Sequence, residues 1–219
     1  MELLTQDAQG TGLQVEALSV RRGEEMLFQG FDCSVQAGQM VWLRGSNGSG
    51  KTSLLRVLAG LATPDSGRVT WNGEPVRSCP QFRSQLVYMG HTNALKDDLT
   101  AMEALQFLGA LQARAWSRPR LEAAMRRMGV HHRRRLPVRS LSQGQRRRLS
   151  LCRLALEERA GFWVLDEPLD ALDAAGVQLV QELLCDNVRR GGTVLFTSHI
   201  PMQADGLGLT ELHLPGGAP

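Results

Sequence analysis

The chain lacks any long hydrophobic run. No apolar stretch approaches the roughly 20 residues that a helix needs to cross a bilayer, although 42% of the 219 residues are hydrophobic. The opening segment MELLTQDAQGTGLQ has neither a basic region nor an apolar core, so we expect no signal peptide. These absences favour a single-domain protein, spanning 1–219, that stays in the cytoplasm and meets a membrane only through a partner.

Cysteine is scarce and widely spaced. Cys33, Cys79, Cys152 and Cys185 form no CxxC pair, and no CxxCH haem-attachment motif occurs. In a cytoplasmic protein this spacing predicts reduced thiols that are mostly packed, and it argues against a zinc site.

Lysine is also scarce, because Lys51 and Lys96 are the only two in the chain. Arginine takes its place, and nine arginines with no acidic residue lie between Arg126 and Arg148. Such a run suits a nucleic acid or an anionic lipid surface. Charge runs more often form solvated helical faces, so we interpret this one as a solvated face and expect no nucleic-acid partner.

The order of the predicted elements indicates an α/β protein. Apolar and alternating patterns predict strands at 13–20, 27–36, 39–45, 161–168 and 192–199. Helical spacing predicts helices at 51–61, 99–112, 118–129 and 174–190. Since buried strands flank the last helix, we expect a parallel sheet with helices on its faces. The stretch from about 92 to 155 reads as a helical insertion.

Local signals refine three of these elements. Leu54, Leu58 and Leu61 are predicted to share one stripe of the helix at 51–61. Thr100 is a candidate N-cap for the helix that follows it. The turn sequences PDSG and NGE flank a further short strand in the segment 63–76.

The segment GSNGSGKTS follows a predicted buried strand and opens a predicted helix. Gly45, Gly50, Lys51 and Thr52 fit the pattern GxxxxGK[ST]. The glycines allow a tight turn in which backbone N–H groups converge on phosphate oxygens, and the start of the helix favours the same anions. Lys51 supplies a charge for the β- and γ-phosphates, and the Thr52 hydroxyl is a ligand for Mg²⁺. The predicted nucleotide-binding residues are Gly45, Ser46, Asn47, Gly48, Ser49, Gly50, Lys51, Thr52 and Ser53.

A P-loop alone leaves kinases, GTPases, helicases and transporters open, and a second carboxylate site narrows the choice. The apolar strand in FWVLDEP ends at Asp166 and Glu167. Asp166 is placed to hold the metal directly or through water. Glu167 is placed to polarise the attacking water as a general base.

Two further motifs support nucleotide chemistry. LSQGQ opens a helix at which Ser142, Gly144 and Gln145 offer a second anion site. That site is redundant unless it closes over a nucleotide bound by another subunit. His199 follows VLFTS, which we take as the final core strand, and from there it can reach the γ-phosphate.

Taken together, these motifs resemble the ATP-binding subunits of ABC transporters. GSNGSGKT looks like Walker A, LSQGQ like the signature, FWVLDE like Walker B, DALD at 170–173 like the D-loop, and TSH like the switch histidine. The resemblance implies a P-loop ABC ATPase fold with a RecA-like parallel-sheet core, an antiparallel β subdomain and a helical subdomain.

The resemblance also implies roles for these residues. Two ATP molecules are sandwiched head-to-tail between two copies of such a subunit. The residues that would act in cis are Lys51, Thr52, Asp166, Glu167 and His199. Ser142, Gly144 and Gln145 would complete the partner's site.

Two positions depart from the family pattern. Arg22 stands where an aromatic residue is expected to stack on adenine, and a guanidinium can stack there instead. His91 stands where the family has a glutamine that ligates Mg²⁺. Imidazole is a poorer ligand for a hard cation. The alternatives for His91 are a contact with the attacking water or a phosphate, which could make activity pH-dependent, and a role that merely fills the loop.

In these departures and in its short length, the chain resembles one subfamily, the ATP-binding subunits of the cytochrome c maturation (haem exporter) system. That resemblance implies a peripheral subunit on the cytoplasmic face of the bacterial inner membrane, paired with integral membrane subunits. ATP hydrolysis would drive haem export or release of a haem-loaded chaperone, with motion passing through the segment from His91 to Leu111. We identify no haem ligand in this chain, and we interpret His131 and His132 as surface residues.

Three rival functions are compatible with parts of the sequence. One is an ABC transporter subunit for a different substrate, because the cargo need not touch this chain. Another is a soluble ABC ATPase that acts on nucleic acid or the ribosome, although neither a second such domain nor a long coiled coil is visible. The third, a scaffold without hydrolysis, fits poorly with the presence of both Lys51 and Glu167.

Overall fold

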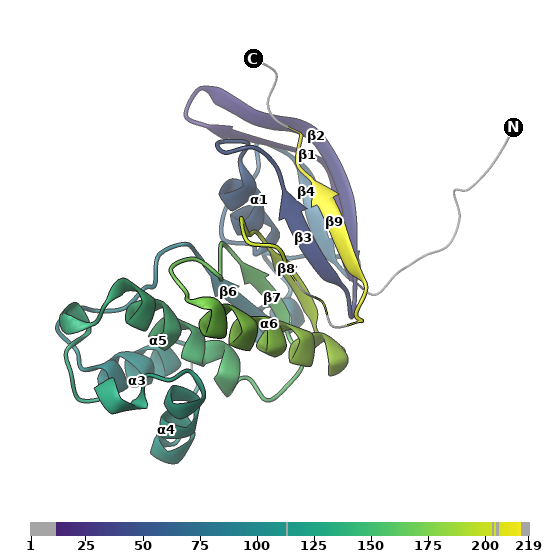
Figure 1. The fold of residues 1–219 in the computed structure, drawn as a ribbon. Helices are drawn as coiled ribbons and strands as arrows, with labels where there is room; N and C mark the ends of the chain where they lie inside the picture. Colours follow the sequence, from purple (N-terminus) through teal and green to yellow (C-terminus); the bar gives the residue numbers. More distant parts are fainter. Residues whose placement is uncertain (1–11, 113, 203, 205, 216–219) are drawn as a thin grey trace, which may run out of the picture.

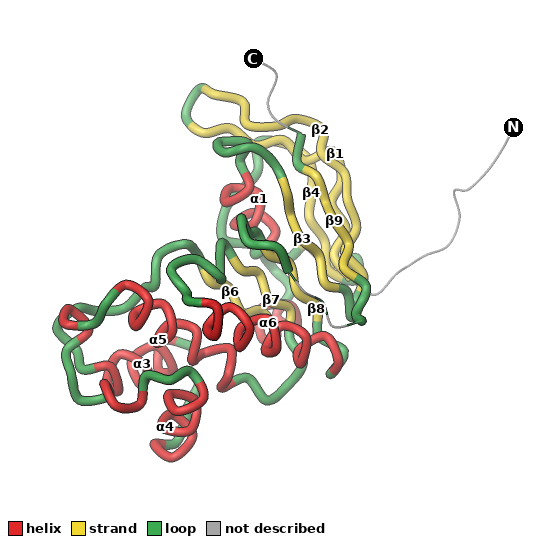
Figure 2. Tube along the Cα trace, in the orientation of Figure 1, coloured by secondary structure: helices red, strands yellow, loops and turns green. Residues whose placement is uncertain are grey.

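The computed structural model describes residues 12–112, 114–202, 204 and 206–215 of the chain. Residues 1–11, on which the expectation of no signal peptide rests, and residues 216–219 of the predicted domain lie outside this description. Two sheets and a group of helices make up the described part (Figures 1 and 2).

A five-stranded sheet forms the centre of the fold, with the order β6-β7-β8-β3-β9. All four strand pairs in it are parallel, as the sequence predicts. Its strands are β3 (Met40–Arg44), β6 (Leu86–Met89), β7 (Phe162–Leu165), β8 (Thr193–Phe196) and β9 (Leu209–His213). Every residue of β7 and β8 is buried, because layers of structure cover both faces of the sheet.

The edge strand β9 was not foreseen from the sequence. It pairs with β3 from Leu209 opposite Met40 to His213 opposite Arg44, and it is only partly buried. The assumption that VLFTS is the final core strand is therefore wrong. β8 also ends at Phe196, so His199 lies beyond the strand, in the loop that follows it. An edge strand faces solvent on one side, so its sequence LTELH carries little apolar pattern.

A separate antiparallel sheet has the order β2-β1-β4-β5. Its strands are β1 (Gly12–Arg22), β2 (Glu25–Gln36), β4 (Ser66–Trp71) and β5 (Glu74–Pro75). The predicted turn between β4 and β5 is confirmed, with positive φ at Asn72 and Gly73. This sheet is the antiparallel part of the expected ABC ATPase fold.

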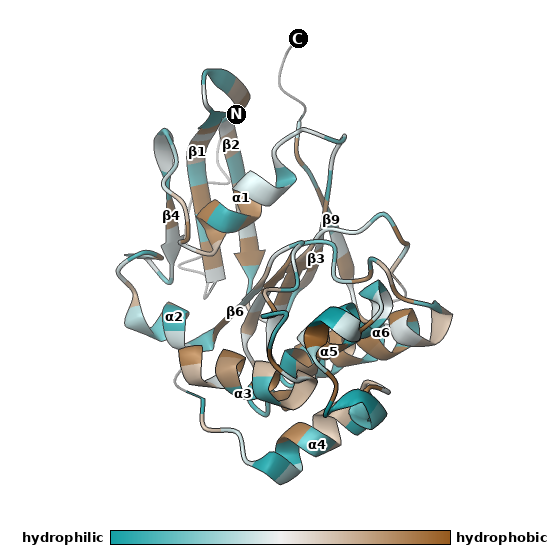
Figure 3. Ribbon diagram, turned by 90° about the vertical axis from the view of Figure 1, so that its left-hand side faces the viewer, coloured by the Kyte–Doolittle hydropathy of each residue, from teal (hydrophilic) through white to brown (hydrophobic). Residues whose placement is uncertain are grey.

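The two faces of the parallel sheet serve two hydrophobic cores. Val41 and Leu43 of β3 pack with the antiparallel sheet and with α1 (Lys51–Leu58). Met40 and Trp42, one position out of phase, pack with the helices on the other face. This division follows from the alternation of side chains along a strand. Figure 3 shows hydrophobic residues along β3 and β6 where these layers meet.

The stripe predicted for the helix at 51–61 is wrong at its last residue. Leu54 and Leu58 are fully buried, but Leu61 is 53% exposed. The helix ends at Leu58 because Gly60 takes a left-handed conformation, with φ 71°, and turns the chain away.

Helices cover the second face of the parallel sheet and extend beyond it (Figure 1). They are α3 (Ala101–Leu111), α4 (Arg118–Arg127), α5 (Gln143–Leu156) and α6 (Ala174–Arg189). The short α2 (Pro80–Gln85) instead packs through Phe82 in the core that contains the antiparallel sheet. Thr100 caps α3 through a capping box with Glu103, as its sequence predicts. Within the described ranges, no helix has the length and apolar character required to cross a membrane.

An aromatic cluster joins the antiparallel sheet to the parallel one. The ring centroids of Trp71 on β4 and Phe162 on β7 lie 5.1 Å apart, and Phe82 of α2 lies 5.4 Å from each. Phe82 and Phe162 are almost completely buried. The cluster therefore helps to set the position of one sheet against the other.

We expect Phe162→Ala to lower the free energy of unfolding by about 3–5 kcal/mol, because the cavity would lie between two layers that cannot easily collapse. Urea unfolding followed by circular dichroism measures the change. The matched control is Phe107→Ala on α3, where the ring is only half-buried beneath Lys96. Equal losses in the two variants would contradict the bridging role of the cluster.

Candidate functional site

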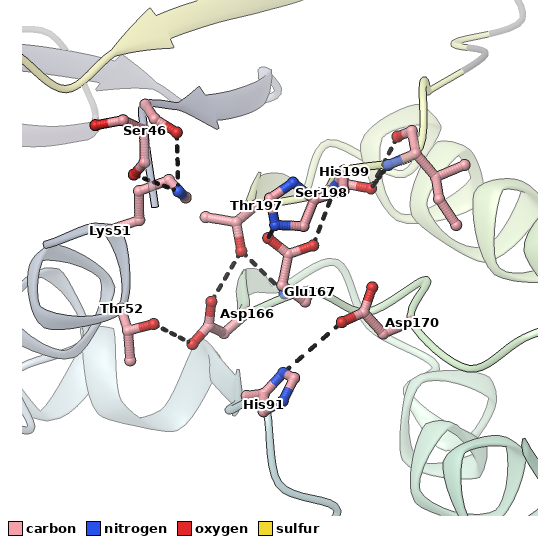
Figure 4. Close-up of polar contacts among 12 residues, drawn as sticks. Ser46, Lys51, Thr52, His91, Asp166, Glu167, Asp170, Thr197, Ser198 and His199 are labelled. Carbon is pink, nitrogen blue, oxygen red and sulfur yellow. Dashed lines mark hydrogen bonds and ion pairs between the residues drawn. The ribbon is translucent and has the colours of Figure 1, made fainter. Parts of the chain in front are cut away.

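A pocket of about 280 Å³ lies where β3, β7 and β8 end, and it gathers residues from distant parts of the chain. Figure 4 shows polar contacts in and around this pocket. The lining residues are Arg22, Leu27, Asn47, Gly48, Gly50, Lys51, Thr52, Ser53, His91, Asp166, Glu167 and His199. The fold thus brings the four predicted catalytic residues and both predicted metal ligands to one place. Gly45, Ser46 and Ser49 belong to the same loop but do not line the pocket.

The loop between β3 and α1 depends on glycine for two reasons. Gly48 and Gly50 have φ values of 83° and 95°, in the left-handed region that other residues rarely adopt. A Cβ atom on Gly50 would also lie 3.0 Å from the Cβ of Leu27 and 3.2 Å from the ring of Phe28. β2 of the antiparallel sheet therefore packs directly against the loop, and a larger residue would push them apart.

Lys51 begins α1 and turns its side chain back over the loop. Its Nζ donates hydrogen bonds to the carbonyl oxygens of Gly45 at 2.9 Å and Ser46 at 3.0 Å. Within the part of the chain that the structure describes, Lys51 forms no ion pair, so its charge is not neutralised by a carboxylate. The first N–H groups of α1 point the same way. The loop is therefore a positively polarised cradle for an anion.

Asp166 is the centre of a hydrogen-bond chain that crosses the pocket (Figure 4). Thr52 Oγ1 donates to its Oδ2 at 2.8 Å, and Thr197 Oγ1 donates to its Oδ1 at 2.9 Å. The Thr197 hydroxyl in turn accepts the backbone N–H of Glu167 at 2.9 Å. Asp166 is only 3% exposed, so both oxygens need these donors.

The Thr52–Asp166 pair fits a hard divalent cation. A hydroxyl and a carboxylate are oxygen donors of the type that Mg²⁺ prefers. Among the described residues, no group of three or more His, Cys, Asp or Glu side chains could hold a metal. A cation at this pair would complete its coordination with further oxygen ligands from water or from a phosphate-bearing molecule.

Glu167 points into the pocket from the end of β7. One carboxylate oxygen accepts the backbone N–H of His199 at 3.1 Å, and the other lies 3.5 Å from His199 Nε2. Burial raises the pKa of the Glu167 carboxyl; His199 opposes this, whereas the charges of Asp170 and Asp166 add to it. Its backbone has φ 49°, an unusual value for a residue that is not glycine.

His91 and Arg22 occupy the rim of the pocket. His91 is largely exposed, and its Nδ1 lies 3.8 Å from the Oδ2 of Asp170. His91 is thus close to the Asp170 carboxylate, and it lines the same pocket as Thr52 and Asp166. Arg22 ends β1 and lines the pocket beside Leu27, at the position that the sequence suggested for a stacking group.

The residues of LSQGQ do not join this pocket. Ser142, Gly144 and Gln145 line a second pocket of about 420 Å³ with His132, Arg148 and Asp173. Ser142 Oγ accepts the backbone N–H of Gln145 at 3.2 Å, and Gln145 Oε1 accepts that of Ser142 at 3.1 Å, so the pair forms a capping box at the start of α5. Within one subunit, the starts of α1 and α5 therefore line different pockets.

Five of the nine arginines in the run form ion pairs with acidic residues. The pairs are Arg126 with Glu122, Arg127 with Asp186, Arg139 with Asp98, Arg146 with Asp97 and Arg148 with Asp173. Interpreting the whole run as a solvated face is wrong for Arg147, which is 3% exposed. Arg147 shares a helical face with the buried residues Leu151 and Leu154, and that spacing could have revealed it.

Thr197 has no role that the sequence predicts beyond its place in the TSH segment. The structure buries this residue completely between Asp166 and Glu167. A threonine after a buried strand carries no distinct signal in the sequence, because its role depends on the neighbouring strand.

The parallel sheet, the glycine-rich loop and the carboxylates at the end of β7 define a P-loop nucleoside triphosphatase. Residues 28–170 match the family model described as ABC transporter. The chain belongs to the ABC transporter family and, within it, to the CcmA subfamily of ATP-binding subunits. It is accordingly an ATP-binding ATPase, and the resemblance seen in its motifs is confirmed.

Individual relatives agree with this placement. The chain is 46% identical over 188 residues to the cytochrome c biogenesis ATP-binding export protein CcmA of Nitrosococcus oceani, covering 85% of each. It is 44% identical to the CcmA protein of Nitrosomonas europaea, covering 84% of this chain and 89% of that one. The ATP-binding cassette MJ0796, solved as a dimer with ADP and phosphate, shares its fold with TM-score 0.74 and 21% identity over 86% of this chain and 88% of that one.

We expect Thr197→Val to lower the free energy of unfolding by about 1–3 kcal/mol, because a methyl group would leave the Glu167 N–H and an Asp166 oxygen without their buried partner. Thermal and urea unfolding measure the loss. Thr197→Ser keeps the hydroxyl and serves as the matched control, with most of the stability retained. A valine variant as stable as the wild type would show that the hydroxyl is dispensable.

Proposed function

We propose that this chain is the ATP-hydrolysing subunit of an ABC transporter complex for cytochrome c biogenesis. One observation carries the catalytic part: Lys51, Thr52, Asp166, Glu167 and His199 converge on a single pocket. The biological part follows from relatives that are named as cytochrome c biogenesis ATP-binding export proteins and are 37–46% identical to the chain. In this proposal, hydrolysis drives haem export or the release of a haem-loaded chaperone.

The loop at 45–53 binds the triphosphate of ATP in this mechanism. Its backbone N–H groups and the start of α1 face the β- and γ-phosphates. Lys51 exchanges its two carbonyl partners for phosphate oxygens, which are stronger acceptors because they are charged. Arg22 stacks on the base through its planar guanidinium. Thr52 and Asp166 would hold Mg²⁺, which supplies neutralisation of phosphate charge when bound.

Glu167 acts as the general base. Its carboxylate faces the pocket from the end of β7 and polarises a water for in-line attack on the γ-phosphorus. Lys51 and His199 stabilise the charge that develops on the transferred group. His91, opposite Asp170, contacts the attacking water or a phosphate from the other side of the pocket.

A second copy of the chain completes each site. Ser142, Gly144 and Gln145 surround their own anion-binding helix start, which lies outside the pocket of the same subunit. In a head-to-tail dimer they contact the partner's ATP, and the dimeric state of the similar structure MJ0796 supports this arrangement. ATP touches both subunits only in the closed dimer, so binding shifts the population toward closure and hydrolysis releases it.

The assembly lies on the cytoplasmic face of the bacterial inner membrane. The chain associates there peripherally, through the integral membrane subunits of the cytochrome c maturation complex. Motion reaches those subunits through the segment from His91 to Leu111. In this proposal haem does not bind the chain directly, and no nucleic-acid partner is expected. A different cargo is the principal alternative, since no cargo site is required here.

We expect the ATPase rate to decline with falling pH at a higher pH than it would if the general base were a solvent-exposed glutamate. Glu167 works in its ionised form, and its pKa is raised by burial, so the rate declines as the pH falls through that raised value. The measurement is kcat against pH at saturating ATP. Asp170→Asn should move the acid limb to lower pH, because it removes a negative charge that raises the pKa of Glu167.

The raised pKa of Glu167 also makes the stability of the fold depend on pH. The folded chain holds the Glu167 proton more tightly than the unfolded chain, so this residue stabilises the fold at low pH and loses that contribution as the pH rises through the raised pKa. Glu167→Gln should therefore abolish hydrolysis without lowering the melting temperature at neutral pH.

In the pH profile of kcat, an acid limb that does not move in Asp170→Asn would count against Glu167 as the titrating base.

We expect Lys51→Ala to lower kcat/KM for ATP by about 10²–10³-fold, since it removes a charge aimed at the transferred phosphate. In cells that carry only this variant at normal abundance, haem staining should show loss of c-type cytochromes while other haem proteins persist. Lys96→Ala alters the only other lysine, which is exposed and does not line the pocket, and should leave kcat/KM for ATP unchanged. Normal c-type cytochromes with an inactive ATPase would contradict the biogenesis role and favour another cargo.

A further inference from the structure

Arg147 is a buried cation that the mechanism above does not use. It lies in α5, the helix that begins with LSQGQ, and only 3% of its surface is exposed. Burial lowers its pKa, and the nearby charges of Asp170, Asp166 and Glu167 act in the opposite direction. Within the described ranges it has no carboxylate in ion-pair contact. Burying a guanidinium costs free energy unless its N–H donors are satisfied. The acceptors that Arg147 binds therefore indicate its role.

The donors of Arg147 converge on the turn that carries Glu167. Nη2 donates to the carbonyl oxygens of Asp166, at 3.3 Å, and of Glu167. Nε donates to the carbonyl oxygen of Pro168 at 3.3 Å. The remaining Nη1 donates to Asn93 Oδ1 at 3.3 Å, in the loop that follows His91. One planar group thus binds three consecutive carbonyl groups, which a fork of fixed geometry can do and a single ammonium cannot.

The turn held in this way is an unusual one. Glu167 has φ 49°, and residues with a side chain enter this region only where the surroundings compel it. Thr197 holds the Glu167 N–H from one side. Arg147 holds the carbonyl groups from the other, so the peptide units on both sides of the Glu167 Cα are fixed. These two peptide planes set the direction of the Cα–Cβ bond of Glu167, and the contacts of its carboxylate with His199 complete the orientation.

We propose that Arg147 is a positioning residue that keeps the Glu167 turn in its left-handed conformation and so aims the carboxylate at the attacking water. The inference rests on the proposed role of Glu167 as general base. Arg147 does not itself line the pocket. Its loss therefore leaves ATP binding at the loop 45–53 intact and slows the chemical step.

The same helix offers a matched control. Arg153 is 7% exposed, and burial lowers its pKa as it does for Arg147. It donates only to the carbonyl oxygen of Tyr88 at 3.5 Å, and its Nε has no hydrogen-bond partner among the described residues. Arg153→Met therefore removes a buried guanidinium from α5 without touching the Glu167 turn.

The experiment compares Arg147→Met with Arg153→Met in the complete complex, reconstituted with its membrane subunits. The three readouts are kcat, the affinity for a fluorescent ATP analogue, and the melting temperature. Arg147→Met should lower kcat by about 100-fold, because a small misplacement of a reacting group has an effect of that order. Its nucleotide affinity should stay unchanged. Arg153→Met should keep the wild-type kcat, whatever its melting temperature.

Equal losses of kcat in the two variants, or a normal kcat in Arg147→Met, would overturn the proposal. If Arg147→Met does not fold, the same measurements on Arg147→Lys test the proposal, because lysine keeps the charge but cannot span three carbonyl groups. Positioning predicts a reduced kcat at unchanged nucleotide affinity for the lysine variant, and a normal kcat overturns it. If the wild-type complex had no ATPase activity, the proposed function itself would be refuted. If the wild type were active and Arg147→Met equally active, only the positioning role would be refuted.

Discussion

The Asp166 carboxylate, held from both sides by threonine hydroxyls, is the contact on which the site depends. Thr52 comes from the helix after β3 and Thr197 from the loop after β8, while Asp166 directly follows the strand β7. The three segments are distant in sequence and meet because parallel strands end at one edge of a sheet. A buried carboxylate needs such donors, so the same bonds that satisfy it also align the P-loop with the catalytic carboxylate.

Burial gives the two carboxylates at the end of β7 different chemistry. Asp166 is surrounded by hydroxyl donors, whereas the pKa of Glu167 is raised because burial outweighs the attraction of His199. The first is suited to a cation beside phosphate, and the second to accepting a proton from water. Arg147 binds the backbone oxygens of the same turn and the side-chain amide oxygen of Asn93, and it forms no salt bridge with either carboxylate.

Much of the fold follows from patterns that depend on neighbours in the sequence. The buried strands 39–45 and 161–168 and the cap at Thr100 all have strong local signals, and the structure contains each of them. β9 was missed because an edge strand needs little apolar pattern. Leu61 was misplaced because Gly60 ends the helix earlier than periodicity suggests. Arg147 was read as surface because the run of like charges masked its place on a buried helical face.

The sequence by itself determined the chemical inventory: a phosphate-binding loop, two carboxylates after an apolar strand, a histidine after another, and a second helix start in LSQGQ. These are local patterns whose chemistry does not depend on distant residues. Only the tertiary structure decided which of them share a pocket, that LSQGQ lies apart from the loop 45–53, and that Thr197 and Arg147 fix the Glu167 turn. Those facts depend on strand order and helix packing, which are set by contacts between residues far apart in the chain.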